Sequence, residues 1–178
     1  ISDTMPDYLE TEGRENAVGP KAIAAPGSLM AWCEMLERFG TLSLSDVMEP
    51  AIRHASRGFT VTPYLSECID EALPGLVLDP VISGVYLQDG KPLPAGTRLA
   101  TPEYAETLRL IASEGASAMY GGEIGRAIVE HMAKTGGLLT MADFTSYATI
   151  ERDVVRGNYR DVEIVGPPPP SSGGVHVI

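Results

Sequence analysis

The string Pro167-Pro168-Pro169-Pro170-Ser171-Ser172-Gly173-Gly174 follows the strand-like segment 162–165. Prolines fix the backbone angle φ and cannot donate to a strand ladder, whereas glycines permit positive φ or a close approach of two backbones. We therefore expect a loop with a stiff first half and an adaptable second half. The two hydroxyls either cap a following helix or flank backbone N–H groups that face an anion, and the sequence leaves both hypotheses open.

The residues upstream of this loop have strand composition. β-branched residues dominate 149–150 and 154–155, and Val162, Ile164 and Val165 predict a strand. Gly157-Asn158 has the composition of a tight hairpin turn. We therefore predict that strands, with a turn at Gly157-Asn158, lead into the proline-rich loop.

Helical patterns dominate the chain before residue 148. Apolar residues recur at helical spacing over 29–39, with Ser28 as the predicted N-cap and Gly40 as a left-handed stop. Four further helices are predicted at about 47–57, at 62–73, from Thr101-Pro102-Glu103 to Gly115, and from Gly122 to Thr135. Their ends are read from these capping signals: Asp46 with Glu49 and Pro50, Gly58, Thr62-Pro63, Pro74-Gly75, Gly136-Gly137, and Thr140 with Asp143 as a further capping box.

Two segments lack a sustained periodic spacing of apolar residues. Residues 1–27 mix proline, glycine and acidic residues and are predicted to be an irregular lead-in. Residues 74–100 are predicted to be an irregular connection with one hairpin, in which 85–87 form a strand before the turn 88–91.

The order of helices first and strands last predicts an α+β fold whose sheet is mostly supplied by sequence outside these residues. The length of 178 residues favours one domain. Because the chain stops in the apolar run 175–178 with no polar tail, we expect 1–178 to be a single partial domain with both ends truncated.

The composition excludes several function classes. A formal net charge of −11 opposes binding to nucleic acid and to anionic lipid surfaces. No apolar run approaches the roughly 20 residues that a membrane-spanning helix needs. Cys33 and Cys68 lack metal-type spacing and leave the redox compartment open.

The proline-rich string resembles the PPPSSGG motif in the large subunit of γ-glutamyltranspeptidases, which follows a strand containing a tyrosine such as Tyr159. Further resemblances to that family occur in the same order along the chain. They are Ala25-Pro26-Gly27, Phe39-Gly40-Thr41, Pro50-Ala51-Ile52 with Gly58-Phe59, Met119-Tyr120-Gly121-Gly122, and Gly136-Gly137-Leu138-Leu139-Thr140 with Asp143 and Tyr147. An ordered series spanning about residues 5 to 178 is far more specific than one motif.

This resemblance implies the helix-rich part of an αββα sandwich of the N-terminal-nucleophile hydrolase class. In that family a precursor cleaves itself, and the freed N-terminal threonine of the small subunit attacks γ-glutamyl amides such as glutathione. The implied partners are that small subunit, a γ-glutamyl donor, and an acceptor that is an amino acid, a peptide or water. No cofactor or metal is implied, and the family favours a periplasmic or secreted location.

The resemblance places no catalytic residue in this chain. The family's nucleophile lies beyond the equivalent of Ile178, and its donor-binding arginine lies just before the equivalent of Ile1, so Arg14 is not that arginine. The matched loop residues are expected to support the active-site region by packing: Pro169, Ser171, Ser172, Gly173 and Gly174.

Other candidate residues have simpler interpretations. Neither Ser171 nor Ser172 sits in a Gly-x-Ser-x-Gly elbow, so a serine nucleophile is disfavoured. His54, His131 and His176 are interpreted as structural residues. The acidic residues Glu34, Glu37, Asp70 and Glu71 are interpreted as solvated helix faces, and Cys33 as a core residue.

Two alternatives remain open beside the γ-glutamyl hypothesis. One is a β-lactam side-chain acylase of the same family, which keeps the fold and changes the acyl group. The other is a non-catalytic helical binding or scaffold domain that retains the family's architecture.

Overall fold

The computed structural model describes residues 17–178. Its contacts group into two compact units, Ile1–Tyr147 and Ala148–Ile178, and each is described by itself. Most of the predicted lead-in, including Arg14, lies outside the described residues. The single partial domain expected from the sequence stays a prediction.

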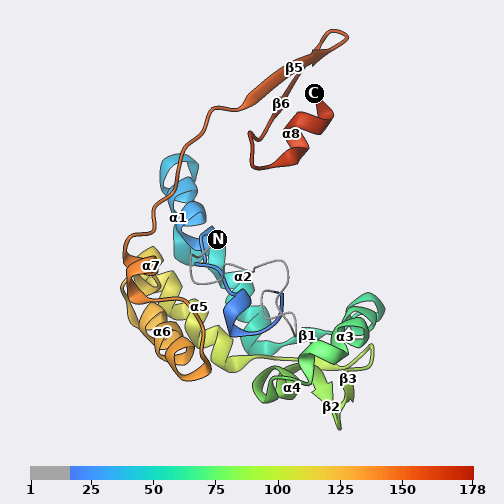
Figure 1. The fold of residues 1–178 in the computed structure, drawn as a ribbon. Helices are drawn as coiled ribbons and strands as arrows, with labels where there is room; N and C mark the ends of the chain where they lie inside the picture. Colours follow the sequence, from blue (N-terminus) through green and yellow to red (C-terminus); the bar gives the residue numbers. More distant parts are fainter. Residues whose placement is uncertain (1–16) are drawn as a thin grey trace. The chain divides into compact units, whose positions relative to one another are not determined.

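The first unit is helical (Figure 1). Its helices are η2 (Pro20–Ala22), α1 (Ser28–Phe39), α2 (Leu44–Arg57), α3 (Pro63–Leu76), α4 (Pro80–Tyr86), α5 (Pro102–Glu114), η3 (Gly115–Ala118), α6 (Glu123–Thr135) and α7 (Met141–Thr145). Its strands form two antiparallel pairs: β1 (Phe59–Thr60) with β4 (Arg98–Leu99), and β2 (Leu87–Gln88) with β3 (Lys91–Pro92). The longest shared face lies between α2 and α5, which run side by side.

Helix α1 covers the predicted residues, but its N-cap residue and the conformation of its C-cap residue differ from the prediction. Its N-cap residue is Gly27, and Ser28 is the first helical residue, so the predicted Ser28 cap is wrong. Gly40 follows the helix with an extended backbone (φ −79°) instead of the predicted left-handed one. Glycine is needed there for another reason, because a Cβ on Gly40 would lie 2.4 Å from the carbonyl oxygen of Leu36.

Helix α2 begins earlier than predicted. Its capping box joins Ser43 and Asp46: the Asp46 N–H donates to Ser43 Oγ at 3.1 Å, and the Ser43 N–H donates to the Asp46 carboxylate at 3.3 Å. The predicted pairing of Asp46 with Glu49 is therefore wrong, and Glu49 instead forms an ion pair with Arg53. Pro50 lies inside the helix, not in its first turn. The predicted end at Gly58 is confirmed.

The region 74–100 holds more structure than predicted. Helix α3 starts after its Thr62 cap as expected but continues through Pro74 to Leu76. Helix α4 was not predicted, although Asp79 caps it by accepting hydrogen bonds from the next helical N–H groups, at 2.8 and 3.0 Å. The predicted hairpin exists as β2 and β3, but 85–86 are helical. Its turn uses Asp89 and Gly90, both with positive φ (53° and 74°), which is the geometry of a tight hairpin turn.

The remaining helix-end signals of the first unit are confirmed. Helix α5 starts at Pro102 and ends at Gly115, whose φ is 68°. Helix α6 ends at Gly136 in the left-handed conformation. Thr140 and Asp143 form the predicted capping box of α7.

The Thr140–Asp143 capping box predicts how the free energy of unfolding depends on pH. The hydroxyl and the backbone N–H of Thr140 each donate to the Asp143 carboxylate at 2.7 Å, and these bonds, the hydroxyl's first, lower the pKa of that carboxyl. A lowered carboxyl pKa contributes stability above its ordinary value of about 4, and this contribution is lost as pH falls through the lower, folded value. We expect the free energy of unfolding to depend less steeply on pH below about 4 in Asp143→Asn than in the unchanged protein. Urea titrations across that range measure both slopes, and equal slopes would contradict the prediction.

Among the described residues of the first unit, 17–147, the buried side chains form three small clusters and no single large core. One cluster lies between α3 and the short strands, one between α2 and α5, and one around α6 and α7. Their buried members are Val61, Ile69, Leu93 and Leu99; Ala55, Ala105 and Leu108; and Met132, Leu139 and Phe144. The start of α1 is tied to the turn between η3 and α6 by the hydroxyl of Tyr120, which donates to Pro26 O and accepts from Met30 N at 3.2 Å.

Candidate functional site: the loop between β6 and α8

The second unit is a hairpin followed by a short helix. Strands β5 (Val155–Tyr159) and β6 (Val162–Gly166) pair antiparallel, and α8 spans Ser172–Val177. The turn lies at Arg160 and Asp161, where Arg160 has a φ of 55°. The predicted turn at Gly157-Asn158 is wrong, because the register pairs Gly157 with Ile164 inside the ladder. The loop of interest, 167–171, joins β6 to α8.

Helix α8 packs on the hairpin at backbone contact distance, and glycines make this possible. Gly174 is buried, and a Cβ there would lie 2.3 Å from Pro167 O and 2.7 Å from a methyl group of Val155. A Cβ on Gly166 of β6 would lie 2.7 Å from the Cα of Gly174. The pair of glycines therefore lets the strand and the helix touch through their backbones.

The other motif residues are more open. A Cβ on Gly173 would meet nothing closer than Ser171 Oγ at 3.8 Å. Ser171 is the N-cap residue of α8, but its side chain makes no capping hydrogen bond, so the hypothesis that its hydroxyl caps the helix is wrong. Its backbone N–H instead donates to Pro168 O at 3.2 Å, which closes a turn within the loop. His176 Nδ1 lies 2.8 Å from Ser172 O, so this histidine contacts backbone within α8.

A residue that the sequence did not single out holds the proline segment. The Arg152 guanidinium donates a hydrogen bond to Pro169 O at 2.8 Å, across 17 residues of sequence. This carbonyl lies in the middle of a run whose prolines have no N–H to bond with. No spacing or composition rule connects Arg152 with the loop, and only the folded geometry reveals the contact. The loop is thus held at three places: by β6, by the Gly174 contact and by Arg152.

We expect Arg152→Ala to loosen this loop without unfolding the unit. The bond is exposed, so its loss should cost about 1 kcal/mol and raise the exchange rate of the Ser171 amide up to roughly fivefold. The matched control is Arg156→Ala, which removes an exposed ion pair with Glu163 on the same hairpin. Amide hydrogen exchange by NMR measures both variants. If the two variants changed the Ser171 amide equally, Arg152 would have no specific hold on the loop.

The remaining candidate residues belong to the first unit. His54 lies on α2 and His131 on α6, and within residues 17–178 no group of three or more metal-ligating side chains comes together. Cys33 is half-buried on α1, and burial raises the pKa of its thiol. No helix in the described part of the chain is long and apolar enough to span a membrane.

The sequence model of the γ-glutamyltranspeptidase family matches residues 2–178. This chain belongs to that family. The match confirms the resemblance seen in the proline-rich loop and in the other motifs that occur in the family's order along the chain. It covers both units.

Relatives of the chain include an acylase proenzyme and a glutathione hydrolase proenzyme. The "Acylase ACY 1 proenzyme" of Pseudomonas sp. (strain SE83) is 51% identical over 99% of this chain and 32% of its own length. The glutathione hydrolase proenzyme of Escherichia coli (strain K12) is 30% identical over 98% of this chain and 30% of its own length. The chain thus spans about a third of the length of these curated relatives.

The fold is that of solved family members. The γ-glutamyltranspeptidase of Helicobacter pylori superposes with a TM-score of 0.89 at 30% identity, over 93% of this chain and 48% of the solved chain. This agreement confirms the predicted class, the helix-rich part of an α+β N-terminal-nucleophile hydrolase with strands near the C-terminal end.

Proposed function

We propose that these 178 residues are an internal part of the large subunit of a self-cleaving proenzyme that breaks amide bonds. The match of the family model to residues 2–178 carries the proposal. Both relatives described above are named as proenzymes, which supports a precursor whose second part supplies the nucleophile. The small subunit of the same precursor is then the partner of this chain.

The proposed reaction runs through an acyl-enzyme on an N-terminal threonine outside these residues. The threonine hydroxyl attacks the amide carbonyl carbon and passes its proton to the threonine's own α-amino group, which then protonates the leaving amine. Water or an amine attacks the resulting ester, the acyl group leaves on it, and the threonine hydroxyl regains its proton. Backbone or side-chain donors that face the carbonyl oxygen stabilise its negative charge in each tetrahedral intermediate.

The role proposed for this chain in that reaction is support. No residue of the chain is assigned to catalysis. The loop residues Pro169, Ser171, Ser172, Gly173 and Gly174 are proposed to form part of the floor of the active-site region. The support for this role is the loop's fixed shape, with Gly174 against Pro167 and the Pro169 carbonyl held by Arg152. Catalytic groups need neighbours that hold them within a fraction of an ångström, and a stiff loop suits that need.

Two acyl groups are candidates for the substrate of the complete protein. Cleavage of γ-glutamyl amides such as glutathione is favoured by the family match and by the glutathione hydrolase relative. An acylase with another acyl group is favoured by identity, since the acylase relative is 51% identical and the glutathione hydrolase relative 30%. A β-lactam side chain is the acyl group proposed for it, because a solved cephalosporin acylase from Bacillus halodurans is also similar to this chain, at 28% identity. The 51% identity makes the acylase the more strongly supported of the two candidates for this protein.

The test uses the complete precursor. We expect it to split into two chains whose second begins with threonine, and we expect a Thr→Ala change at that junction to abolish both splitting and activity. Turnover of a γ-glutamyl anilide is then compared with turnover of glutaryl and adipyl amides. A precursor that never splits and hydrolyses none of these amides would contradict the proposal and favour the non-catalytic scaffold hypothesis.

A further inference from the structure

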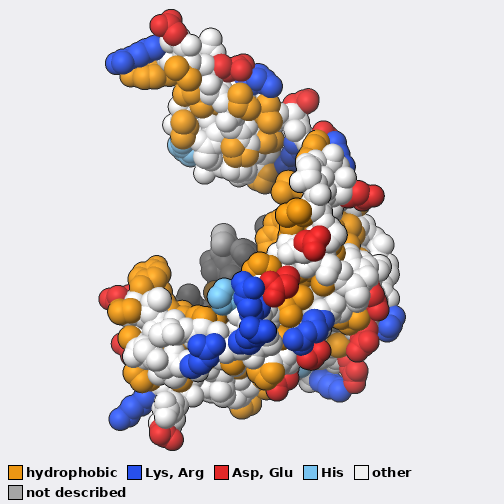
Figure 2. Space-filling model, turned by 180° about the vertical axis from the view of Figure 1, so that it is seen from behind, with side chains coloured by type: hydrophobic (Ala, Val, Ile, Leu, Met, Phe, Trp, Pro, Cys, Tyr) orange, Lys and Arg blue, Asp and Glu red, His pale blue; other side chains and the backbone are white. Residues whose placement is uncertain are grey.

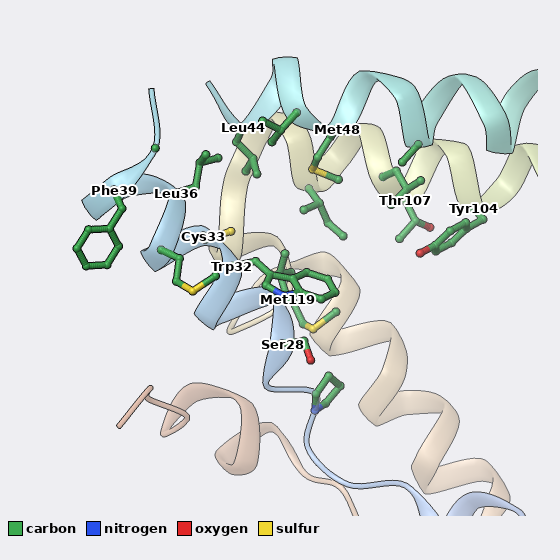
Figure 3. A pocket seen from close by; sticks show the side chains of 18 residues that line it. Ser28, Trp32, Cys33, Leu36, Phe39, Leu44, Met48, Tyr104, Thr107 and Met119 are labelled. Atoms are coloured by element: carbon green, nitrogen blue, oxygen red, sulfur yellow. The ribbon is translucent and has the colours of Figure 1, made fainter. Parts of the chain in front are cut away.

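The first unit carries an open apolar groove between α1 on one side and α2 with α5 on the other (Figure 3). Its volume is about 920 Å³. In the close-up, Trp32 of α1 and Met48 of α2 point into the space, and Phe39 lies at one end. The groove is lined by Pro26, Ser28, Leu29, Trp32, Cys33, Met35, Leu36, Phe39, Gly40, Leu44, Val47, Met48, Ala51, Tyr104, Thr107, Leu108, Ile111 and Met119.

The lining of the groove is uncharged throughout, although 21% of the chain is charged. Several of its largest side chains stand in solvent: Phe39 is 73% exposed and Trp32 is 63% exposed. Contiguous apolar surface of this kind is rare on monomeric proteins and marks a surface that another group covers. On the face that Figure 2 draws, by comparison, charged side chains lie among the hydrophobic ones.

We propose that a further segment of the same polypeptide, outside these 178 residues, covers this groove with an apolar face of its own. The curated relatives carry about three times the length of this chain, and the solved Helicobacter pylori chain about twice its length. In a protein of that length, a covering segment would be linked to the groove through the same polypeptide, which gives it a high effective concentration at the groove. The inference needs only family membership and does not depend on the proposed reaction.

Two other occupants fit less well. A second copy of the chain would bring together two bodies of formal charge −11, which repel each other. A small molecule would need polar groups that fix its orientation, and the lining offers side-chain hydroxyls only at Ser28, Thr107 and Tyr104. The sulfur-containing side chains Cys33, Met35, Met48 and Met119 instead suit an irregular polypeptide surface, because they adapt their shape to it.

The first experiment labels the complete protein with hydroxyl radicals and reads modification by mass spectrometry. The rate at each residue is divided by the rate of the same residue in urea-unfolded protein. Trp32 and Phe39 are expected to react several-fold more slowly, on this scale, than Tyr64 on α3. Tyr64 is 75% exposed in this structure, close to the 73% of Phe39, and lies outside the groove. Equal normalised rates at the three residues would overturn the inference.

The second experiment compares Phe39→Lys with Tyr64→Lys in the complete protein. A charge placed in a covered apolar surface is costly, so Phe39→Lys should lower the melting temperature by about 5 °C or more and Tyr64→Lys by less than about 2 °C. The helix dipole opposes this result, because lysine is favoured at the C-terminal end of α1 and disfavoured in the first turn of α3. A larger loss at position 39 therefore has to come from covering of the groove.

The remaining outcomes are also decisive. If native mass showed an oligomer that Phe39→Lys dissociates, a second copy would be the occupant and the inference would be overturned. If both lysine variants melted like the unchanged protein, the groove would be exposed in the complete protein, and the inference would again fail. A complete protein that is inactive on amides but protects Trp32 would reject the proposed function and leave this inference standing.

Discussion

Gly174→Ala is expected to break the packing of α8 on the β5–β6 hairpin. The added Cβ would lie 2.3 Å from Pro167 O and 2.7 Å from the Val155 methyl group, and the Gly166 carbonyl carbon is 3.1 Å away. Two of these three atoms are backbone, so the clash is relieved only by moving the helix away from the strand. Overpacking of this kind costs about 1–3 kcal/mol, and the rigid neighbours place Gly174→Ala near the upper value.

Amide hydrogen exchange of the β5–β6 ladder measures the effect. A loss of about 3 kcal/mol corresponds to roughly a hundredfold increase in exchange through opening of this unit. The neighbouring Gly173→Ala is the control, because it adds the same atom where nothing lies within 3.8 Å. Alanine is a better helix former than glycine, so Gly173→Ala should slow exchange slightly, with a gain of up to about 1 kcal/mol. Equal effects of the two changes would mean that Gly174 does not hold the helix on the hairpin.

These two glycines show how much of the loop can be predicted from the sequence. The string 167–174 predicts a stiff loop with an adaptable end, and the family that it resembles is confirmed. The sequence did not distinguish Gly173 from Gly174, because both stand in the same motif. The difference arises from the register of the hairpin, which sets Gly166 against Gly174 and leaves Gly173 in open space.

Helix ends that rest on local chemistry were predictable. The stops at Gly58, Gly115 and Gly136 and the capping box of α7 depend only on residues within one turn, and all four are confirmed. Errors occurred where two local signals competed. Ser43 and Asp46 have the same spacing as Asp46 and Glu49, and the earlier pair is the one that forms.

Contacts made by packing were less predictable. Pro50 and Pro74 lie inside α2 and α3. The sequence predicts a first-turn position for Pro50 and a helix that ends before Pro74, because proline disfavours a helix interior by about 3 kcal/mol. Tertiary contacts of α2 and α3 outweigh that local penalty. The hydrogen bond from Arg152 to Pro169 O also could not be predicted from local signals, since it joins two segments that only the folded hairpin brings together.

Phe144→Ala is expected to unfold the buried cluster around α6 and α7. Phe144 lies on α7, is 0% exposed, and packs with the buried side chains of Met132 and Leu139. Removing a buried phenylalanine ring costs about 3–5 kcal/mol, because it combines the lost transfer of the ring from water with the cavity left behind. Urea titration followed by circular dichroism measures the loss in free energy of unfolding.

The same cluster explains why this effect should exceed that of any exposed aromatic residue. A Cβ on Gly125 of α6 would already lie 3.7 Å from the Phe144 ring and 2.1 Å from Met119 O, so α6 approaches its neighbours closely and has little freedom to collapse into a cavity. Tyr64→Ala, which removes a 75% exposed ring from α3, is the control and should change stability by no more than about 0.5 kcal/mol. If Phe144→Ala cost no more than Tyr64→Ala, the contacts of α6 and α7 would not be a core, and the close approach at Gly125 would need another cause.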